Sequence, residues 1–505
     1  MAVLDTDPGS ETYGTVVGWT DLPGLGDEVH HFGWNACSSA LCPSAPHPHV
    51  ERRYLIVPGL RSSRIHVFDT EDTGAGVSPK LVKVIEAEEL AKRGGYSRPH
   101  TVHCGPDGIY VSALGGAGGL AVLDHVNFEV RGAWEADRGP QHLAYDFWWH
   151  LNHDVLVTSE WGTPSMIEDG VVGELLLGRK YGHKLHFWDL RSRRHVQEVD
   201  LGDQHQMPLE QARKVITIPA EPADPADLPP VLRPFGAVPP LVTDIDLSVD
   251  DQRLYVSCWG TGELKQYDVS DPFAPVEIGS LRIGGIVGRK AHPARPEQEL
   301  RGGPQMVEIS RDGRRVYLTN SLYGSWDDQF YPEGVGSWLA KVDTESFTFD
   351  ERFFVTDFRG LRPHQVKLQG GDASSDSFCY RRRDPARRLR AVAAGVQAAL
   401  PLGGHEADPA PGGRMVVPDV VGARGRADAH PRVRGFARGA HADGRAGGGG
   451  APHAGDVRGR GRDRGGGLRG GGAERAAQGV GQRRPGVWAV ALVVAGVVTL
   501  ATAAT

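Results

Sequence analysis

The sequence predicts an all-β protein, specifically a β-propeller, from two observations. The segment from Leu247 to Ser257 recurs 62 residues later, from Ile309 to Thr319, and each copy joins an aspartate-containing turn to an alternating strand. Strand pairs of this kind recur at blade-sized intervals, and the second strand of each pair ends in an aspartate, namely Asp69, Asp124, Asp189, Asp268 or Asp343. Recurrence of one strand-turn-strand unit at least five times favours a propeller over a β-sandwich array.

The segments between these strand pairs contain little helix. Residues 87–93 have the composition of a short helix, which we expect to be an insert between two blades. Cys258 continues the alternating strand that begins at Leu254, so we expect it to be a small core residue. Four of the tryptophans are expected to pack within blades, namely Trp148, Trp149, Trp161 and Trp259.

The composition divides the chain after Tyr380. Residues 1–380 are expected to form the propeller domain, whereas residues 381–490 contain 21 Arg, no Lys and 9 acidic residues and have no Ser, Thr, Asn, Ile, Tyr or Cys. A stretch this poor in β-branched and aromatic residues cannot build a core, which predicts a disordered low-complexity tail over residues 381–485. Translation of a GC-rich gene in a shifted frame would give the same composition, and both interpretations stay open.

Residues 486–505 are a weak candidate for a membrane span. They carry no charge and follow two arginines, and the stretch is long enough to cross a bilayer. Its Ala, Gly and Thr content makes it only weakly hydrophobic. No charged-then-apolar signal peptide opens the chain, and five cysteines in 505 residues do not form a disulfide framework, so we expect a cytoplasmic protein.

The charge of the propeller region argues against nucleic acid as a partner. The whole chain has a formal net charge of −7, but residues 1–380 carry 35 basic and 54 acidic side chains. Non-specific binding to nucleic acid needs clustered Lys and Arg, which this acidic region lacks.

Histidines and cysteines occur in three segments that are typical of loops or strand ends. The first contains His30, His31, Cys37 and Cys42. The second contains His100, His103 and Cys104, and the third contains His364. Imidazole suits copper, zinc and iron, and thiolate adds softness. The sequence has no Cys-x-x-Cys, His-Glu-x-x-His, Gly-x-Ser-x-Gly or P-loop motif, so a metal site would have to be assembled from several blades around the central channel. The alternative is that each histidine simply bonds a neighbouring carbonyl at the end of a strand.

These segments resemble the selenium-binding protein family, whose bacterial members include methanethiol oxidases. The resemblance covers about residues 4–380, and its motifs occur in order at residues 30–39, 62–65, 100–104, 145–148, 160–161, 243–245, 302–306, 321–323, 326–327, 329–332 and 370–376. It implies a seven-bladed β-propeller. It also implies an oxidase that uses copper to convert methanethiol, oxygen and water into formaldehyde, hydrogen sulfide and hydrogen peroxide.

The resemblance also implies which residues form the site. The expected copper ligands are His30, His31, His100, His103 and His364, of which His100, His103 and His364 are also expected to be catalytic. Cys37 is the expected selenium-binding residue. Copper is therefore the expected cofactor, selenium is a second candidate, and methanethiol and O2 are the expected small-molecule partners. The alternative function is a non-catalytic propeller that carries selenium or a metal, or serves as an interaction platform.

The chain departs from the family pattern at three places. Ala40 stands where some relatives carry a second cysteine, and this difference argues against a two-thiol selenium site. The first motif lies close to the start of the chain, whereas many relatives have some fifty more residues there. Residues 210–214 join two motifs directly, where relatives have a few dozen more residues. We therefore expect one blade to be incomplete, which would leave unpaired strand edges.

Overall fold

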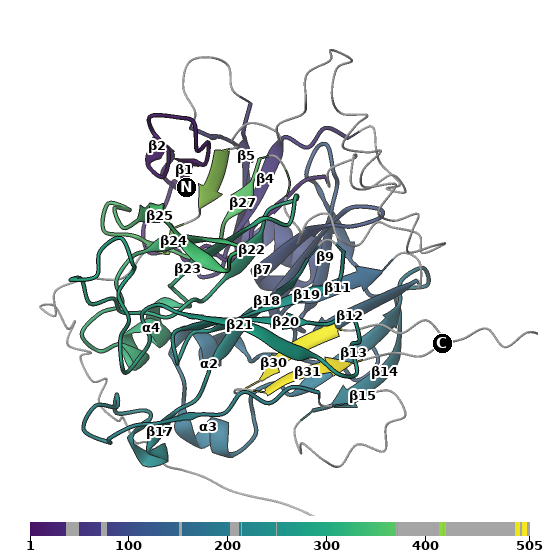
Figure 1. Cartoon of the computed structure of the whole chain (residues 1–505). Coiled ribbons are helices and arrows are strands. Elements are labelled where there is room, and N and C mark those ends of the chain that lie inside the picture. Colours follow the sequence, from purple (N-terminus) through teal and green to yellow (C-terminus); the bar gives the residue numbers. More distant parts are fainter. Residues whose placement is uncertain are drawn as a thin grey trace, which may run out of the picture. The chain divides into compact units, whose positions relative to one another are not determined.

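The computed structural model is an all-β propeller with a few short helices (Figure 1). It describes residues 1–36, 50–71, 78–150, 154–201, 212–213, 215–248, 250–369, 371, 414–417, 419–420, 490–494 and 497–501. All of these belong to one unit, Met1–Ala423 with Gly486–Thr505. The second unit, Arg424–Pro485, lies outside the described residues.

Five antiparallel sheets are each built from four consecutive strands and form the blades. The first blade contains β3 (Gly33–Trp34), β4 (Tyr54–Gly59), β5 (Arg64–Asp69) and β6 (Lys80–Ile85). The second contains β7 (Tyr96–Cys104), β8 (Ile109–Gly116), β9 (Gly119–Leu123) and β10 (Val130–Ala133). The third contains β11 (Phe147–His150), β12 (Val155–Ser159), β13 (Lys184–Asp189) and β14 (Arg194–Asp200). The fourth contains β18 (Val242–Leu247), β19 (Arg253–Cys258), β20 (Glu263–Asp268) and β21 (Val276–Arg282). The fifth contains β22 (Val307–Ile309), β23 (Arg315–Thr319), β24 (Leu339–Asp343) and β25 (Thr348–Val355).

The predicted aspartates mark the same position in every blade. Each stands at the end of the third strand or directly after it, and its carboxylate accepts a hydrogen bond from a backbone N–H two or three residues further on. These five residues are Asp69, Asp124, Asp189, Asp268 and Asp343. A short carboxylate that bonds its own backbone starts a turn, so the repeat seen in the sequence is the turn into the fourth strand.

The repeated sequence segments form equivalent hairpins, as predicted. Ser248 donates to Asp250 at 2.6 Å in the turn from β18 to β19, and Ser310 donates to Asp312 at 2.6 Å in the turn from β22 to β23. Cys258 is fully buried in β19, which confirms its expected place in the core.

The helices are short, and the expected helical insert is present. It consists of α1 (Ala87–Glu89) and the π-helical turn η1 (Leu90–Gly94), which join the first blade to the second. The other helices are α2 (Pro164–Glu168), α3 (Gly173–Leu177), the 3₁₀ turn η2 (Arg233–Phe235) and α4 (Gly324–Phe330). Of these, α2 and α4 contact each other.

A sixth four-stranded sheet combines strands from distant parts of the chain. Its order is β2 (Val16–Trp19), β1 (Ala2–Asp5), β28 (Arg414–Val417) and β27 (Lys367–Leu368). The start of the chain thus pairs with a segment that follows the fifth blade (Figure 1). A further two-stranded sheet pairs β26 (Arg362–Pro363), just before β27, with β29 (Asp419–Val420), just after β28.

The expectation of seven blades is wrong, because the residues that the structure describes form five. Between β14 and β18 the described residues form only the two-residue strands β15 (Ala212–Arg213), β16 (Glu221–Pro222) and β17 (Ala237–Val238). β16 pairs with β17, while β15 pairs with β31 (Val497–Ala501), whose other neighbour is β30 (Val490–Val494). This stretch therefore does not supply the four consecutive strands of a blade, at the place where the sequence joins two motifs directly.

The predicted tail and span are described only in part. Within residues 381–485 the described residues are 414–417 and 419–420, and within residues 486–505 they are 490–494 and 497–501; all of these are in strands. The rest of both predictions lies outside the described residues. In the part of the chain that the structure describes, no helix is long and apolar enough to cross a membrane.

Candidate metal centre

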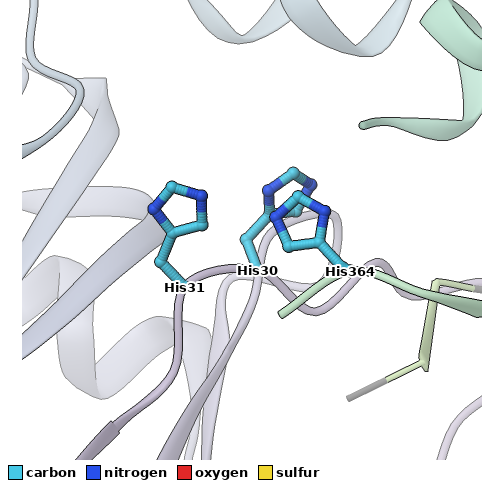
Figure 2. Close-up of side chains that lie close together, drawn as sticks. All are labelled: His30, His31 and His364. Atoms are coloured by element: carbon cyan, nitrogen blue, oxygen red, sulfur yellow. The ribbon is translucent and has the colours of Figure 1, made fainter. Parts of the chain in front are cut away.

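Three buried histidines bring their ring nitrogens together. One ligand atom each from His30, His31 and His364 lies within 4.8 Å of the other two. His30 and His31 follow the β-bridge between Val29 and Gly59, and His364 directly follows β26. Figure 2 shows the rings of His30 and His31 on the same side of their loop, with His364 reaching the ring of His30 from another segment. Two distant parts of the chain therefore form one cluster.

His100 lies directly beside this group. Its ring centroid is 4.9 Å from that of His30 and 4.6 Å from that of His31. His100 belongs to β7, whose register with β8 shifts between Pro99 and Val102. An irregularity of this kind re-aims a side chain out of the strand's regular alternation. His100 thereby becomes a fourth imidazole at the site.

The loop that carries His30 and His31 is held against β7. The backbone N–H of Val102 donates to the carbonyl of His31 at 2.9 Å. The two backbones approach so closely that a Cβ at Gly33 would lie 2.4 Å from the carbonyl oxygen of Val102. Only glycine permits this approach, which brings the His31 loop onto the strand that carries His100.

Four ring nitrogens of the site histidines have no hydrogen-bond partner among the described residues. Nδ1 of His364 bonds the carbonyl of Ser321 at 2.8 Å, and Nδ1 of His100 bonds Oγ1 of Thr101 at 2.9 Å. Nε2 of both rings and both nitrogens of His30 are buried without a hydrogen-bond partner. Buried polar atoms are normally paired, so these nitrogens point to a ligand.

The environment favours neutral imidazoles. Burial, followed by the neighbouring imidazoles, lowers the pKa of His30 and of His100 well below the usual value. Burial, with a smaller effect of His31, lowers the pKa of His364 to about 3. A neutral imidazole is the form that binds a metal, so these rings are in their ligand form at neutral pH.

Asp146 connects the cluster to His103. One carboxylate oxygen lies 3.6 Å from Nδ1 of His31, and the other lies 3.9 Å from Nε2 of His103. Burial alone would raise the pKa of Asp146, but its bonds to His103 and His31 outweigh burial and hold this pKa well below its ordinary range. The ring of His103 packs against Phe147 and Trp149 instead of the other imidazoles. His103 is therefore one step removed from the cluster.

The carbonyl that orients His364 is itself fixed by a buried carboxylate. Ser321 donates from Oγ to Asp327 at 2.6 Å, and the N–H of Leu322 donates to the same carboxylate at 2.9 Å. Arg362 pairs with Asp327 at 3.1 Å. Because Arg362 lies two residues before His364, this network ties both sides of the His364 contact together.

The structure thus brings together four of the five expected metal ligands, and Cys37 lies outside the described residues. Sequence reasoning did not single out several residues that contact the site. Thr101 bonds His100, Asp146 faces His31, and the rings of Tyr145, Trp161 and Tyr323 pack against His100 or His30. All five stand in motifs of the family resemblance, and Trp161 was expected only to pack within a blade. Their position in those motifs is the signal that could have found them.

This donor set fits a transition metal. Several neutral, buried imidazoles with unpartnered nitrogens suit copper, zinc, iron or nickel better than magnesium or calcium, which prefer oxygen ligands. Contacts of ring nitrogens with a carbonyl, a hydroxyl and a carboxylate are of the kind that orients histidine ligands in metal sites. The cluster could therefore hold a metal ion.

The comparisons with known proteins identify the family of this chain. The family of the 56 kDa selenium-binding protein matches residues 1–213 and 210–379, so the two matched segments overlap at residues 210–213. The chain belongs to this family. It is 34% identical over 443 residues to a methanethiol oxidase of Xenopus laevis, covering 74% of this chain and 90% of that protein, and 34% identical over 441 residues to the human methanethiol oxidase, with the same coverage.

Two further relatives carry the family name. A selenium-binding protein 2 of Mus musculus is 34% identical over 441 residues, covering 74% of this chain and 90% of its own. The X-ray structure of a hypothetical selenium-binding protein from Sulfolobus tokodaii is 52% identical and superimposes with a TM-score of 0.70, covering 75% of this chain and 91% of that chain. Relatives named methanethiol oxidase support that activity at the level of the family.

Proposed function

We propose that this chain is a copper-dependent methanethiol oxidase, which converts methanethiol, O2 and water into formaldehyde, hydrogen sulfide and hydrogen peroxide. The observation that supports this most strongly is the buried group of His30, His31 and His364 beside His100. It occurs in a chain 34% identical to relatives named methanethiol oxidase.

In this proposal His30, His31 and His364 bind the copper, and His100 completes the donor set. Copper bound there supplies a redox centre and a soft acid that favours the thiolate form of a sulfur ligand. The burial of all four histidines, none more than 4% exposed, keeps bulk water away from the reacting atoms.

The surrounding residues orient these ligands. The carbonyl of Ser321 holds His364 through Nδ1, and Thr101 lies between His100 and His31, 2.9 Å and 3.3 Å from their Nδ1 atoms. Asp146 faces His31 and His103 together. We therefore assign His103 as a positioning residue that acts through Asp146, rather than as a copper ligand.

The experiment combines metal analysis with turnover of the full chain. We expect about one copper per chain, release of hydrogen sulfide from methanethiol, loss of this release on chelation, and recovery with copper but not with zinc. Replacing the exposed His142 by Gln serves as the control for loss of a histidine away from the site. Turnover that continues after the metal has been removed would exclude the copper mechanism.

A selenium carrier is the second candidate, because the matched family is described by selenium binding. Cys37 remains the predicted selenium-binding residue. If both functions occur in one chain, Cys37→Ser should lose selenium uptake from selenite and keep copper and turnover. Selenium uptake without any methanethiol turnover would favour the carrier. The cytoplasmic location remains a prediction.

A further inference from the structure

Two aromatic side chains line the side of the cluster formed by His100. The ring of Tyr145 lies 4.8 Å from that of His100, and Trp161 meets His100 edge-on at 5.9 Å. Tyr145 and Trp161 also contact each other, edge to face, at 4.9 Å. Burial, with Asp146 and Asp244 adding to it, raises the pKa of Tyr145 well above its ordinary value, so its ring stays uncharged. This side of the site is therefore an uncharged aromatic wall.

This wall is where the buried cluster comes nearest to solvent among its described ring contacts. The histidines are at most 4% exposed, and Tyr323, which packs on His30, is fully buried. Tyr145 and Trp161 are both partly exposed. Tyr145 and Trp161 are therefore the ring contacts of His100 that solvent can reach.

Trp161 is held firmly in this place. The backbone N–H of Gly182 donates to the carbonyl of Trp161 at 2.5 Å, and a Cβ at Gly182 would lie 2.7 Å from the Trp161 nitrogen. Trp161 also packs edge-on against Trp326 at 5.5 Å. The indole of Trp326, on α4, donates to the carbonyl of Ile167, on α2, at 3.1 Å. Two helices therefore support the indole of Trp161.

We propose that Trp161 determines which thiols reach the site, by limiting the length of the alkyl group that fits beside His100. This inference rests on the proposed function and adds the residue that selects the substrate. A smaller side chain in place of this indole would make room for an alkyl chain longer than methyl, while sulfur packs favourably at aromatic edges. One methylene in an apolar site changes selectivity by about 10–200-fold, which is the scale expected here.

The first test measures selectivity. For the copper-loaded full chain, kcat/KM is determined with methanethiol, ethanethiol and 1-propanethiol in the wild type, Trp161→Ala, Trp161→Phe and the control Trp134→Phe, which alters a buried indole in another part of the core. We expect Trp161→Ala to raise the ratio of 1-propanethiol to methanethiol by about tenfold or more. Trp161→Phe should give a smaller rise and covers the case in which the alanine variant fails to fold. An unchanged ratio in the folded Trp161 variants would overturn the proposal.

The second test does not require turnover. Diethyl pyrocarbonate modifies accessible histidines, and mass spectrometry reports its addition to His100 in the metal-stripped full chain. We expect faster modification of His100 in Trp161→Ala than in the wild type or Trp134→Phe, and equal rates would count against the role of Trp161. If the wild type releases no hydrogen sulfide from methanethiol, the proposed function fails, while this measurement still decides whether Trp161 controls access.

Discussion

The Nδ1 atom of His364 lies 2.8 Å from the carbonyl oxygen of Ser321 and donates a hydrogen bond to it. Because a carbonyl only accepts hydrogen bonds, this contact places the ring proton on Nδ1 and leaves the lone pair on Nε2. Nε2 is buried without another partner, and His364 belongs to the cluster with His30 and His31. The chain has thus prepared this imidazole in the tautomer that binds a metal through Nε2.

Replacing His364 by Ala should weaken copper binding severely. The variant loses one member of the three-histidine group, so we expect a loss of affinity greater than the roughly 10–100-fold typical of residues that only orient a ligand. Competition with a chelator of known affinity measures the dissociation constant. His142→Gln is the control, since His142 is exposed. Wild-type affinity in the His364 variant would remove it from the site.

Replacing Asp146 by Asn should weaken copper binding moderately. The carboxylate faces His31 and His103, and its conversion to an amide removes the charge without changing the size of the side chain. We expect affinity to fall by about 10–100-fold, with the metal still binding at saturation. The same chelator competition tests this, and an unchanged affinity would show that Asp146 does not orient the ligands.

His100 and His103 should respond differently to replacement by Ala. The ring of His100 lies within 5 Å of two cluster rings, whereas His103 contacts Asp146, Phe147 and Trp149. We therefore expect the His100 variant to lose most of its copper and the His103 variant to keep it with reduced affinity. Copper content after dialysis distinguishes the two. Equal loss in both variants would contradict this division of roles.

His292 should make the protein less stable in mild acid. Burial, with a smaller effect of Arg295, lowers its pKa from 6.5 to about 4. As pH falls from 6.5 towards 4, the unfolded chain takes up a proton that the folded chain does not. The free energy of unfolding therefore falls by up to about 1.4 kcal/mol per pH unit, or about 3 kcal/mol in total. Above pH 6.5 this residue has no effect.

Urea unfolding of the metal-free protein at several pH values between 7 and 4.5 measures this dependence. In His292→Gln the slope against pH should be reduced by the equivalent of about one proton. His142→Gln should leave the slope unchanged, because this side chain is exposed. Identical slopes for the wild type and the His292 variant would contradict the prediction.

The buried ion pair of Glu308 with Lys367 links the fifth blade to the sixth sheet, and its contribution to stability can be tested. Nζ of Lys367 on β27 lies 2.7 Å from Glu308 on β22, and both side chains are 2% exposed. Lys367→Met should destabilise the protein by about 3–5 kcal/mol, because it removes the lysine from a buried carboxylate. Combining it with Glu308→Leu should recover much of this loss, as measured by urea unfolding. A single variant as stable as the wild type would show that the pair is unimportant.

Local turn chemistry made the blades predictable. Asp189 and Asp268 bond backbone groups within three residues, so their role can be recognised from a short stretch of sequence. The number of blades depends instead on pairing between distant segments. Val3 pairs with Val416, and β15 pairs with β31, contacts that no local pattern encodes. The expectation of seven blades therefore failed where strands from distant segments meet.

The site was predictable as a set of histidines but not as a geometry. His100 and His103 both lie in β7, and the family resemblance implied both as copper ligands without distinguishing them. The register shift between Pro99 and Val102 separates them, since it directs His100 to His30 and His31. Asp146 reaches this site from the start of another blade, so its role becomes visible only in three dimensions.

The cluster joins His30 and His31, near the start of the propeller sequence, to His364 near its end. A single ion bound there would connect the first and last parts of the propeller and oppose their separation during unfolding. By mass action an ion present at a thousand times its dissociation constant adds about 4 kcal/mol of resistance to unfolding. Without that ion the chain would unfold more readily and proteases would cleave it faster.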